Sequence, residues 1–445
     1  MSDALPLPPR PNLEQYKKLA KDLQRACKSG DSSAIRNWAA HWHETIARLQ
    51  GQKITSALRG QIDRAAAHMA KLWEKFQQTN EGAERCTLTG AQFFVARGHG
   101  FASWPKFAEH VEALAGLNSP VSKFEEAVEA IVAGDAEGLK KLLRENPELA
   151  RARSTREHRS TLLHYVSANG VEDFRQKTPG NIVEITELLL DAGADVNAES
   201  EAYGGGSTAL GLVATSIHPE QAGVQIALLQ TLLERGARLD QPSAAGNAHS
   251  IVYGCLANGQ PAAAEFLVSA GASLDMVSSA GLGRMALLKS YFDENGAPRP
   301  PVDQRQMEAA FEQACWYGRK EAVEFLLDRG IDPGLRSGRG MTGLHRAAHT
   351  LHVDVLKLLL DRGAPVDAKD EEHYATPLDV ALWVWGRSSD EAVRERCYEA
   401  IALLAQNGAR LDPNQWSGPA IDGPGMLEKI RADARMQAAL RGGSK

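Results

Sequence analysis

Three histidines lie at helical spacing and are the first residues that could do chemistry. His345, His349 and His352 stand four and three residues apart, so a helix could present them to one metal ion. No cysteine or carboxylate completes such a set at helical spacing. His41 and His43 in the run HWHE point to different sides of a helix and do not form the HExxH motif. We therefore expect no metal and no other cofactor.

No nucleophile stands in a pattern typical of catalysis, since neither a Gly-x-Ser-x-Gly elbow nor a Cys/His pair stands out. The cysteines are odd in number, lie far apart and form no CxxC pair, which favours reduced thiols in a cytoplasm over a disulfide framework or a zinc knuckle. We therefore expect a cytoplasmic protein that is not an enzyme. The five cysteines are Cys27, Cys86, Cys255, Cys315 and Cys397.

A glycine-rich run that starts at Tyr203 could bind an anion. Free backbone amides at a helix start, beside flexible glycines, can hold a phosphate or a carboxylate. Arg175 and Lys177 could add charge only if the chain bends back. Alternatively, the glycines allow a tight finger, and Ser207 or Thr208 caps the helix. The anion hypothesis makes this a small-anion or metabolite-sensing regulatory protein. Its candidate residues are Gly204, Gly205, Gly206, Ser207 and Thr208.

Charge and hydropathy limit the partners. Residues 1–120 carry 16 basic and 11 acidic side chains, whereas the rest of the 445 residues has a net charge of −11. A basic head is compatible with nucleic-acid contact, which is a third hypothesis, but the charges are spread without a Lys/Arg run and disfavour it. No apolar stretch approaches the roughly 18 residues that span a bilayer. We expect no membrane segment.

A repeated phrase predicts the fold. Two or three apolar residues, a polar pair, a glycine and a small or apolar residue return along the chain, with glycine spacings of 43, 35, 59, 33 and 45. A glycine in the left-handed conformation ends a helix at low cost. Threonines upstream, such as Thr161, Thr342 and Thr376, are typical helix caps. The six glycines are Gly193, Gly236, Gly271, Gly330, Gly363 and Gly408.

The best unit, TGLHRAAHTLHVDVLKLLLDRGA at 342–364, resembles an ankyrin repeat, and the period of about 33 agrees. The resemblance implies a mainly α-helical solenoid, protein binding and no catalytic residues. Asp379 takes the place of the usual repeat histidine, and we expect it to hydrogen-bond near a helix start. We predict eight units, some degenerate: 124–153, 160–198, 207–241, 248–276, 277–293, 307–334, 341–368 and 375–412.

Three segments make up the predicted domain organisation. Residues 1–118 form an N-terminal helical domain, with helices capped by Asn12 and Thr89 among others, and resemble a head module of bacterial ankyrin-repeat proteins. Residues 121–414 form the ankyrin repeat domain. Residues 415–445 form a tail with one short helix, 426–440, that covers the open end of the stack.

Large aromatic residues fall on the first helices of several units, where a tightly stacked layer cannot bury them. They either fill gaps beside lengthened turns or anchor a partner. Charged residues on neighbouring fingers either orient a partner or form a solvated rim. Our leading hypothesis is a scaffold that binds an unidentified protein through its concave face and fingers; the oligomeric state stays open. The candidate residues are Tyr203, Trp316, Tyr317, Arg336, Arg339, Arg346, His373, Tyr374, Trp383 and Trp385.

Overall fold

The computed structural model describes residues 4–8, 11–31, 33–49, 51–79, 86–116, 118–239, 250–416 and 423–442. The chain forms two compact units, Met1–Ile251 and Val252–Lys445. The start of the unit expected at 248–276 lies outside the described residues. No helix in the described ranges has the length and apolar character needed to cross a membrane.

Five helices form the head, which is part of the first compact unit. Aromatic side chains such as Trp42, Trp73 and Phe107 fill its core. The cap predicted at Thr89 is wrong: Thr87 has the extended backbone of a cap, and its Oγ1 accepts a hydrogen bond from the Gly90 amide at 3.0 Å. The helices are α1 (Leu13–Lys28), α2 (Ala34–Leu49), α3 (Ser56–Thr79), α4 (Leu88–Gly98) and α5 (Trp104–Ala115).

A disulfide joins Cys27 and Cys86, so the expectation that all cysteines are reduced is wrong for this pair. The two residues are 59 positions apart but lie at the end of α1 and just before α4, which pack together. The cysteine argument for a reducing compartment therefore loses its support. Cys255, Cys315 and Cys397 are buried thiols; burial raises the pKa of Cys255 to about 12, which keeps it protonated.

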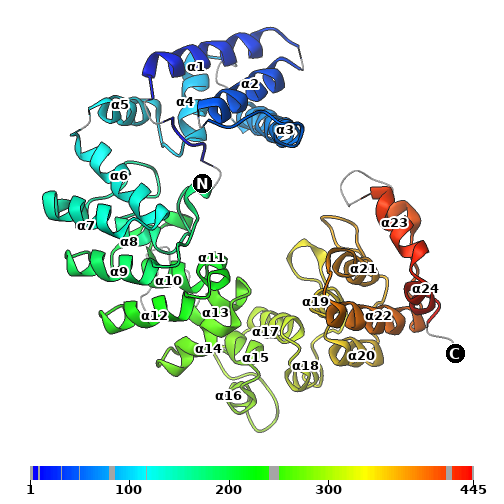
Figure 1. Ribbon diagram of the computed structural model, residues 1–445. Helices are drawn as coiled ribbons and strands as arrows, with labels where there is room; N and C mark the ends of the chain where they lie inside the picture. Colours follow the sequence, from blue (N-terminus) through cyan, green and yellow to red (C-terminus); the bar gives the residue numbers. More distant parts are fainter. Residues whose placement is uncertain are drawn as a thin grey trace. The chain divides into compact units, whose positions relative to one another are not determined.

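Helix pairs follow the head in the first unit (Figure 1). A two-stranded antiparallel hairpin forms one finger, with Glu199 opposite Thr208 and Ser200 opposite Ser207. The elements are α6 (Pro120–Ala133), α7 (Ala136–Glu145), η1 (Pro147–Arg151), α8 (Leu162–Tyr165), η2 (Asp173–Arg175), α9 (Ile182–Asp191), β1 (Glu199–Ser200), η3 (Ala202–Gly204), β2 (Ser207–Thr208), α10 (Ala209–Ala214), α11 (Ile217–Gln221) and α12 (Gln225–Glu234).

In the second unit five helix pairs are followed by a C-terminal segment. The pair α15/α16 is the degenerate unit predicted within the 59-residue spacing. Across both units, all six repeat glycines have positive φ, as expected. The elements are α13 (Ile251–Ala257), α14 (Pro261–Ser269), α15 (Met276–Gly281), α16 (Met285–Ser290), α17 (Gln304–Trp316), α18 (Lys320–Leu327), η4 (Gly338–Gly340), α19 (Gly343–Thr350), α20 (Val353–Asp361), α21 (Pro377–Arg387), α22 (Glu391–Gln406), η5 (Pro413–Trp416), α23 (Gly423–Ala432) and α24 (Ala434–Leu440).

In two of the repeats a buried histidine links the start of the first helix to the following repeat. The Thr342 amide donates to Nδ1 of His345 at 3.1 Å, which fixes Nδ1 as an acceptor. Nε2 then donates to the carbonyl oxygen of Ala375, in the following repeat, at 3.0 Å. One side chain therefore provides hydrogen-bond partners both for a backbone amide at its own helix start and for a carbonyl oxygen of the neighbouring finger. The same arrangement joins Thr161, His164 and Ser207.

Asp379 replaces this histidine in the last repeat, and its predicted role in hydrogen bonding is confirmed. Its Oδ2 accepts from the amide and the hydroxyl of Thr376 at 2.9 and 2.8 Å. Its Oδ1 accepts from the indole Nε1 of Trp416, which follows the repeat, at 3.1 Å. Burial raises the pKa of Asp379, although these hydrogen bonds oppose the rise.

A buried network of charges holds together the first two repeats. Arg156 contacts Glu125 and Glu172, each at 2.7 Å, and Arg175 contacts Glu125 at 2.7 Å and Glu172 at 3.4 Å. Burial alone raises the pKa of Glu125, but the two guanidinium groups outweigh it and lower that pKa to about 2. Arg175 also reaches the more exposed Glu129 at 2.6 Å. Each buried charge is thus neutralised by a partner.

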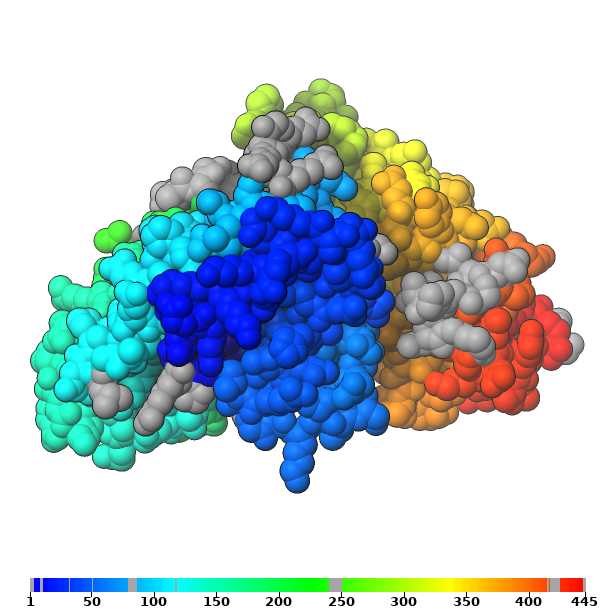
Figure 2. Space-filling model, turned by 90° about the horizontal axis from the view of Figure 1, so that it is seen from above, coloured from blue at the N-terminus to red at the C-terminus, as the bar shows by residue number. Residues whose placement is uncertain are grey.

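The head docks on the finger that precedes α8. The Glu157 amide donates to the Gly100 carbonyl oxygen at 2.9 Å, and Arg97 pairs with the Glu157 carboxylate at 2.5 Å. His110 Nδ1 lies 2.7 Å from the Thr155 hydroxyl oxygen. In the space-filling view, the blue head and the cyan residues that follow it form a continuous surface (Figure 2). The head and the first repeats therefore form one unit.

The tail contains two helices rather than the single helix predicted. The break falls at Asp433, which caps α24 by accepting from the Met436 amide at 2.9 Å. Met426, Ile430 and Met436 are buried in the core of the second unit. The tail therefore covers the end of the last helix pair, as expected.

Replacing Glu172 by Ala removes a carboxylate between two buried guanidinium groups. We expect the unfolding free energy of the first unit to fall by about 3–5 kcal/mol, because an uncompensated buried charge remains. Urea denaturation measures this loss. The control is Glu129→Ala. The Glu129 side chain is 62% exposed, so this substitution should lower the unfolding free energy by less than about 1 kcal/mol. Equal losses from the two variants would contradict the prediction.

Acid should destabilise the first unit before its carboxylates titrate. Burial lowers the pKa of His164 to about 4, against about 6.5 when unfolded. Below pH 6.5 the unfolded chain therefore binds a proton that the folded chain excludes. The free energy of unfolding thus decreases as the pH is lowered from 6.5 toward 4. We expect a lower thermal midpoint at pH 5 than at pH 7.5.

The variant His164→Asn gives this pH prediction a control. Its free energy of unfolding should be about 1–3 kcal/mol lower than that of the native protein at pH 7.5, because two buried hydrogen bonds break. This difference in stability, the gap, should be smaller at pH 5. A gap that stays constant over this range would show that His164 does not titrate on unfolding.

Candidate binding surface on the inner helices

Three rings stack across consecutive repeats of the second unit. Trp316, His349 and Trp383 lie on α17, α19 and α21, the first helices of their pairs. The ring centroids of Trp316 and His349 are 5.0 Å apart with planes at 21°, and those of His349 and Trp383 are 5.7 Å apart at 28°. We call these three side chains the aromatic column.

The repeat itself explains the column. The three residues are 33 and 34 positions apart, and α19 packs against both α17 and α21. Equivalent positions on neighbouring helices therefore face one another. All three residues are only partly buried, so the column keeps surface that a partner could contact.

A guanidinium group lies over each tryptophan of the column. Arg346 lies 5.7 Å from the ring centroid of Trp316, and Arg387 lies 4.6 Å from that of Trp383. Such cation–π contacts stabilise both groups. Arg346 is also held by the Glu312 carboxylate at 2.7 Å. Burial lowers the pKa of His349, so its ring is neutral at neutral pH.

Two of the other predicted aromatic residues of this unit, Tyr317 and Trp385, are held by contacts within the repeats. The Tyr317 hydroxyl donates to the Leu256 carbonyl oxygen at 2.6 Å, and burial raises the pKa of Tyr317 to about 12. Trp385 is 3% exposed, and its ring lies beneath the guanidinium of Arg394 at 4.8 Å. Neither side chain joins the column.

The charged finger residues pair with each other. Arg339 contacts the Glu372 carboxylate at 3.0 Å, and its carbonyl oxygen accepts from the Glu371 amide at 2.8 Å. Arg336 donates to the carbonyl oxygen of Lys369. These bonds connect the two neighbouring fingers. His373 and Tyr374 are largely exposed at the tip of the second finger.

The glycine-rich finger of the first unit uses its polar groups internally. The Ser207 hydroxyl donates to the Ala202 carbonyl oxygen at 2.9 Å, and Thr208 caps α10 through the Gly211 amide at 3.2 Å. The exposed Tyr203 ring is tied to Asn169 through its hydroxyl at 2.5 Å. These contacts match the tight-finger alternative. Three positive φ angles permit the turn, at Gly204, Gly205 and Gly206.

The basic residues considered for that finger lie elsewhere: Arg175 belongs to the buried charge network, and Lys177 is exposed. The anion hypothesis thus has no specific support.

The three histidines at helical spacing have separate environments, since His345 links two repeats, His349 belongs to the column and His352 packs beside Gly318. Among the described residues, no three His, Cys, Asp or Glu side chains are grouped to hold a metal ion.

Sequence reasoning found both tryptophans of the column but missed His349. It was treated as a possible metal ligand, although its distance of 33 residues from Trp316 and 34 from Trp383 is a visible signal. The repeat period predicts that such positions are neighbours.

Comparison with known proteins identifies the repeats. Residues 311–415 match a family model for ankyrin repeats in three copies. The mouse B-cell lymphoma 3 protein homolog is 28% identical over 147 residues, 31% of this chain and 30% of that protein. Human ankyrin repeat and KH domain-containing protein 1 is 33% identical over 105 residues, 24% of this chain and 4% of that protein. The chain thus spans less than a third of these relatives.

Two solved structures are also similar. The human ASB11 ankyrin repeat domain is 20% identical with a TM-score of 0.30, covering 62% of this chain and 96% of that domain. The ankyrin repeat domain of Bcl-3 is 18% identical with a TM-score of 0.29, covering 61% of this chain and 96% of that domain.

Replacing His349 by Ala removes the middle ring of the column. We expect the second unit to lose about 1–2 kcal/mol of stability, because two stacking contacts disappear, and the near-ultraviolet circular dichroism of the tryptophans to change. The control is His373→Ala, an exposed finger histidine, which should change neither. An unaltered tryptophan signal in His349→Ala would show that the rings do not stack.

Proposed function

We propose that the ankyrin repeats of this chain form a non-enzymatic scaffold that binds a protein partner along α17, α19 and α21. The aromatic column forms the centre of the contact. The fingers that carry Arg339, His373 and Tyr374 form its edge. The observation that carries the proposal is the column itself, placed on the first helices of repeats whose family is a known protein-interaction module.

Composition supports this choice of surface. Tryptophan and arginine are enriched among the residues that dominate binding energy in protein interfaces. Here two tryptophans, each beneath an arginine, lie within one short stretch of three helices. The rings lose little conformational entropy on binding, because packing between helices already holds them in place. A partner would therefore meet a preorganised surface.

Site-specific photo-crosslinking in the full chain tests the proposal. With p-benzoylphenylalanine in place of Arg387, beside the column, we expect a discrete adduct with one protein in cells of the source organism. The same group in place of the exposed Lys357, on α20, should give no such adduct, because α20 is the second helix of its pair.

The variant Trp383→Ala, combined with the group at 387, gives a second test. The yield of the cross-linked adduct should fall at least about tenfold, because loss of a central tryptophan weakens the binding free energy by about 2 kcal/mol or more. Equal adducts at positions 387 and 357, or an adduct that Trp383→Ala leaves unchanged, would overturn the proposal.

A further inference from the structure

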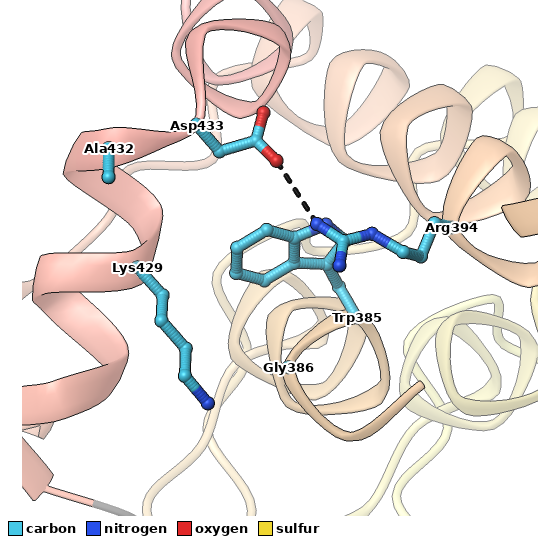
Figure 3. A pocket seen from close by; sticks show the side chains of 6 residues that line it. All are labelled: Trp385, Gly386, Arg394, Lys429, Ala432 and Asp433. Atoms are coloured by element: carbon cyan, nitrogen blue, oxygen red, sulfur yellow. Dashed lines mark hydrogen bonds and ion pairs between the residues drawn. The ribbon is translucent and has the colours of Figure 1, made fainter. Parts of the chain in front are cut away.

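A cavity of about 430 Å³ lies between the last helix pair and the tail. Its walls come from α21, α22, α23 and the junction of α23 with α24 (Figure 3). The volume falls in the range of small-ligand sites. The residues that line it are Trp385, Gly386, Arg394, Lys429, Ala432 and Asp433.

The cavity is separate from the aromatic column. Trp383 and Trp385 are two residues apart on α21, so their side chains leave the helix on different sides. Trp383 stacks on His349 of the preceding repeat, whereas Trp385 lines the cavity beside the tail.

Incomplete covering of the last helix pair leaves this space. Met426 of α23 packs closely on Gly386, where an added Cβ would lie 2.0 Å from the Met426 Cε atom. Ile430, one turn further on, is also buried. Lys429 and Ala432 lie on the wall of the open part, so α23 seals one edge of the cavity and leaves the other accessible.

Among the side chains that line the cavity, positive charges outnumber negative charges by one. Arg394 pairs with Asp433 at 3.1 Å, and Asp433 also accepts from the Tyr398 hydroxyl at 2.8 Å. Lys429 is exposed and has no ion-pair partner among the described residues. Both hydrogen bonds that Arg394 donates to described residues use Nη2. Its Nη1 and Nε groups therefore remain as donors.

We propose that this cavity binds a single carboxylate group attached to a short apolar body. The carboxylate pairs with Lys429 and accepts from Arg394, while the body lies against Ala432 and the small part of Trp385 that lines the cavity. One carboxylate neutralises the surplus charge. A phosphate monoester carries about −1.5 to −2 at neutral pH, so the Asp433 carboxylate would repel its second charge.

The carboxylate can belong to a free organic acid or to a peptide, and the same chemistry recognises both. Either source goes beyond the proposed function, because the cavity does not include the aromatic column. Loss of binding here would leave the cross-linking result at position 387 unaffected.

Titration of the full chain, with its tryptophan indoles labelled with ¹⁵N, tests the proposal by NMR. The Trp385 signal is identified by its absence in Trp385→Phe. We expect 3-phenylpropionate and the peptide acetyl-Ala-Ala-Phe to shift that signal saturably, whereas 3-phenylpropionamide and inorganic phosphate do not. Tighter binding of the peptide identifies a peptide carboxylate as the ligand, and tighter binding of the free acid identifies a small molecule; both support the site.

Lys429→Gln should weaken binding about fivefold, as expected for loss of one partly exposed ion pair. Its matched control, Lys357→Gln on α20, should bind as the native chain does. Both lysines are exposed, so neither variant should unfold the protein. The proposal is overturned if neither carboxylate binds, if phosphate binds as tightly, or if Lys429→Gln leaves the affinity unchanged.

Discussion

No helix pair in this protein can bury its own apolar face, so each depends on the next pair in the stack. That constraint sets the distance between repeats and leaves polar groups at every helix start that need partners. His345 meets both demands, because its two ring nitrogens bond its own helix start and the next finger. Once the distance between repeats is set, residues one repeat period apart become neighbours. The stacking of the three rings of the aromatic column follows from this arrangement.

The first repeats of the first unit and the last repeat of the second unit depart from this rule, and each departure has a different physical basis. In the first unit the head packs on a finger, and the buried charges of Arg156, Arg175, Glu125 and Glu172 lie beneath that finger. Burial disfavours every one of these ions, but mutual pairing offsets the cost. The network therefore holds this region in one arrangement, since removing any member leaves an opposite charge buried.

In the second unit an aspartate replaces the repeat histidine at the last position. Asp379 bonds its own helix start with one oxygen and Trp416 with the other, so the segment after the last repeat is held by the same kind of link. The tail then breaks at Asp433, whose carboxylate also binds Arg394 and Tyr398. The result is a cover that closes much of the last apolar face and leaves a polar cavity.

The amino-acid sequence by itself determined the repeat, helix ends within the repeats and two members of the column. Glycines with positive φ and threonine caps act within a few residues of their own position, and a period of 33 or 34 residues shows which positions become neighbours. Tertiary structure alone decided the Cys27–Cys86 disulfide, the buried charge network and the cavity beside Trp385. The cause is distance along the chain: Cys27 and Cys86 are 59 residues apart, Glu125 and Arg156 are 31 apart, and Arg394 and Asp433 are 39 apart, all outside any repeated pattern. Only the packing of whole helices brings such pairs together.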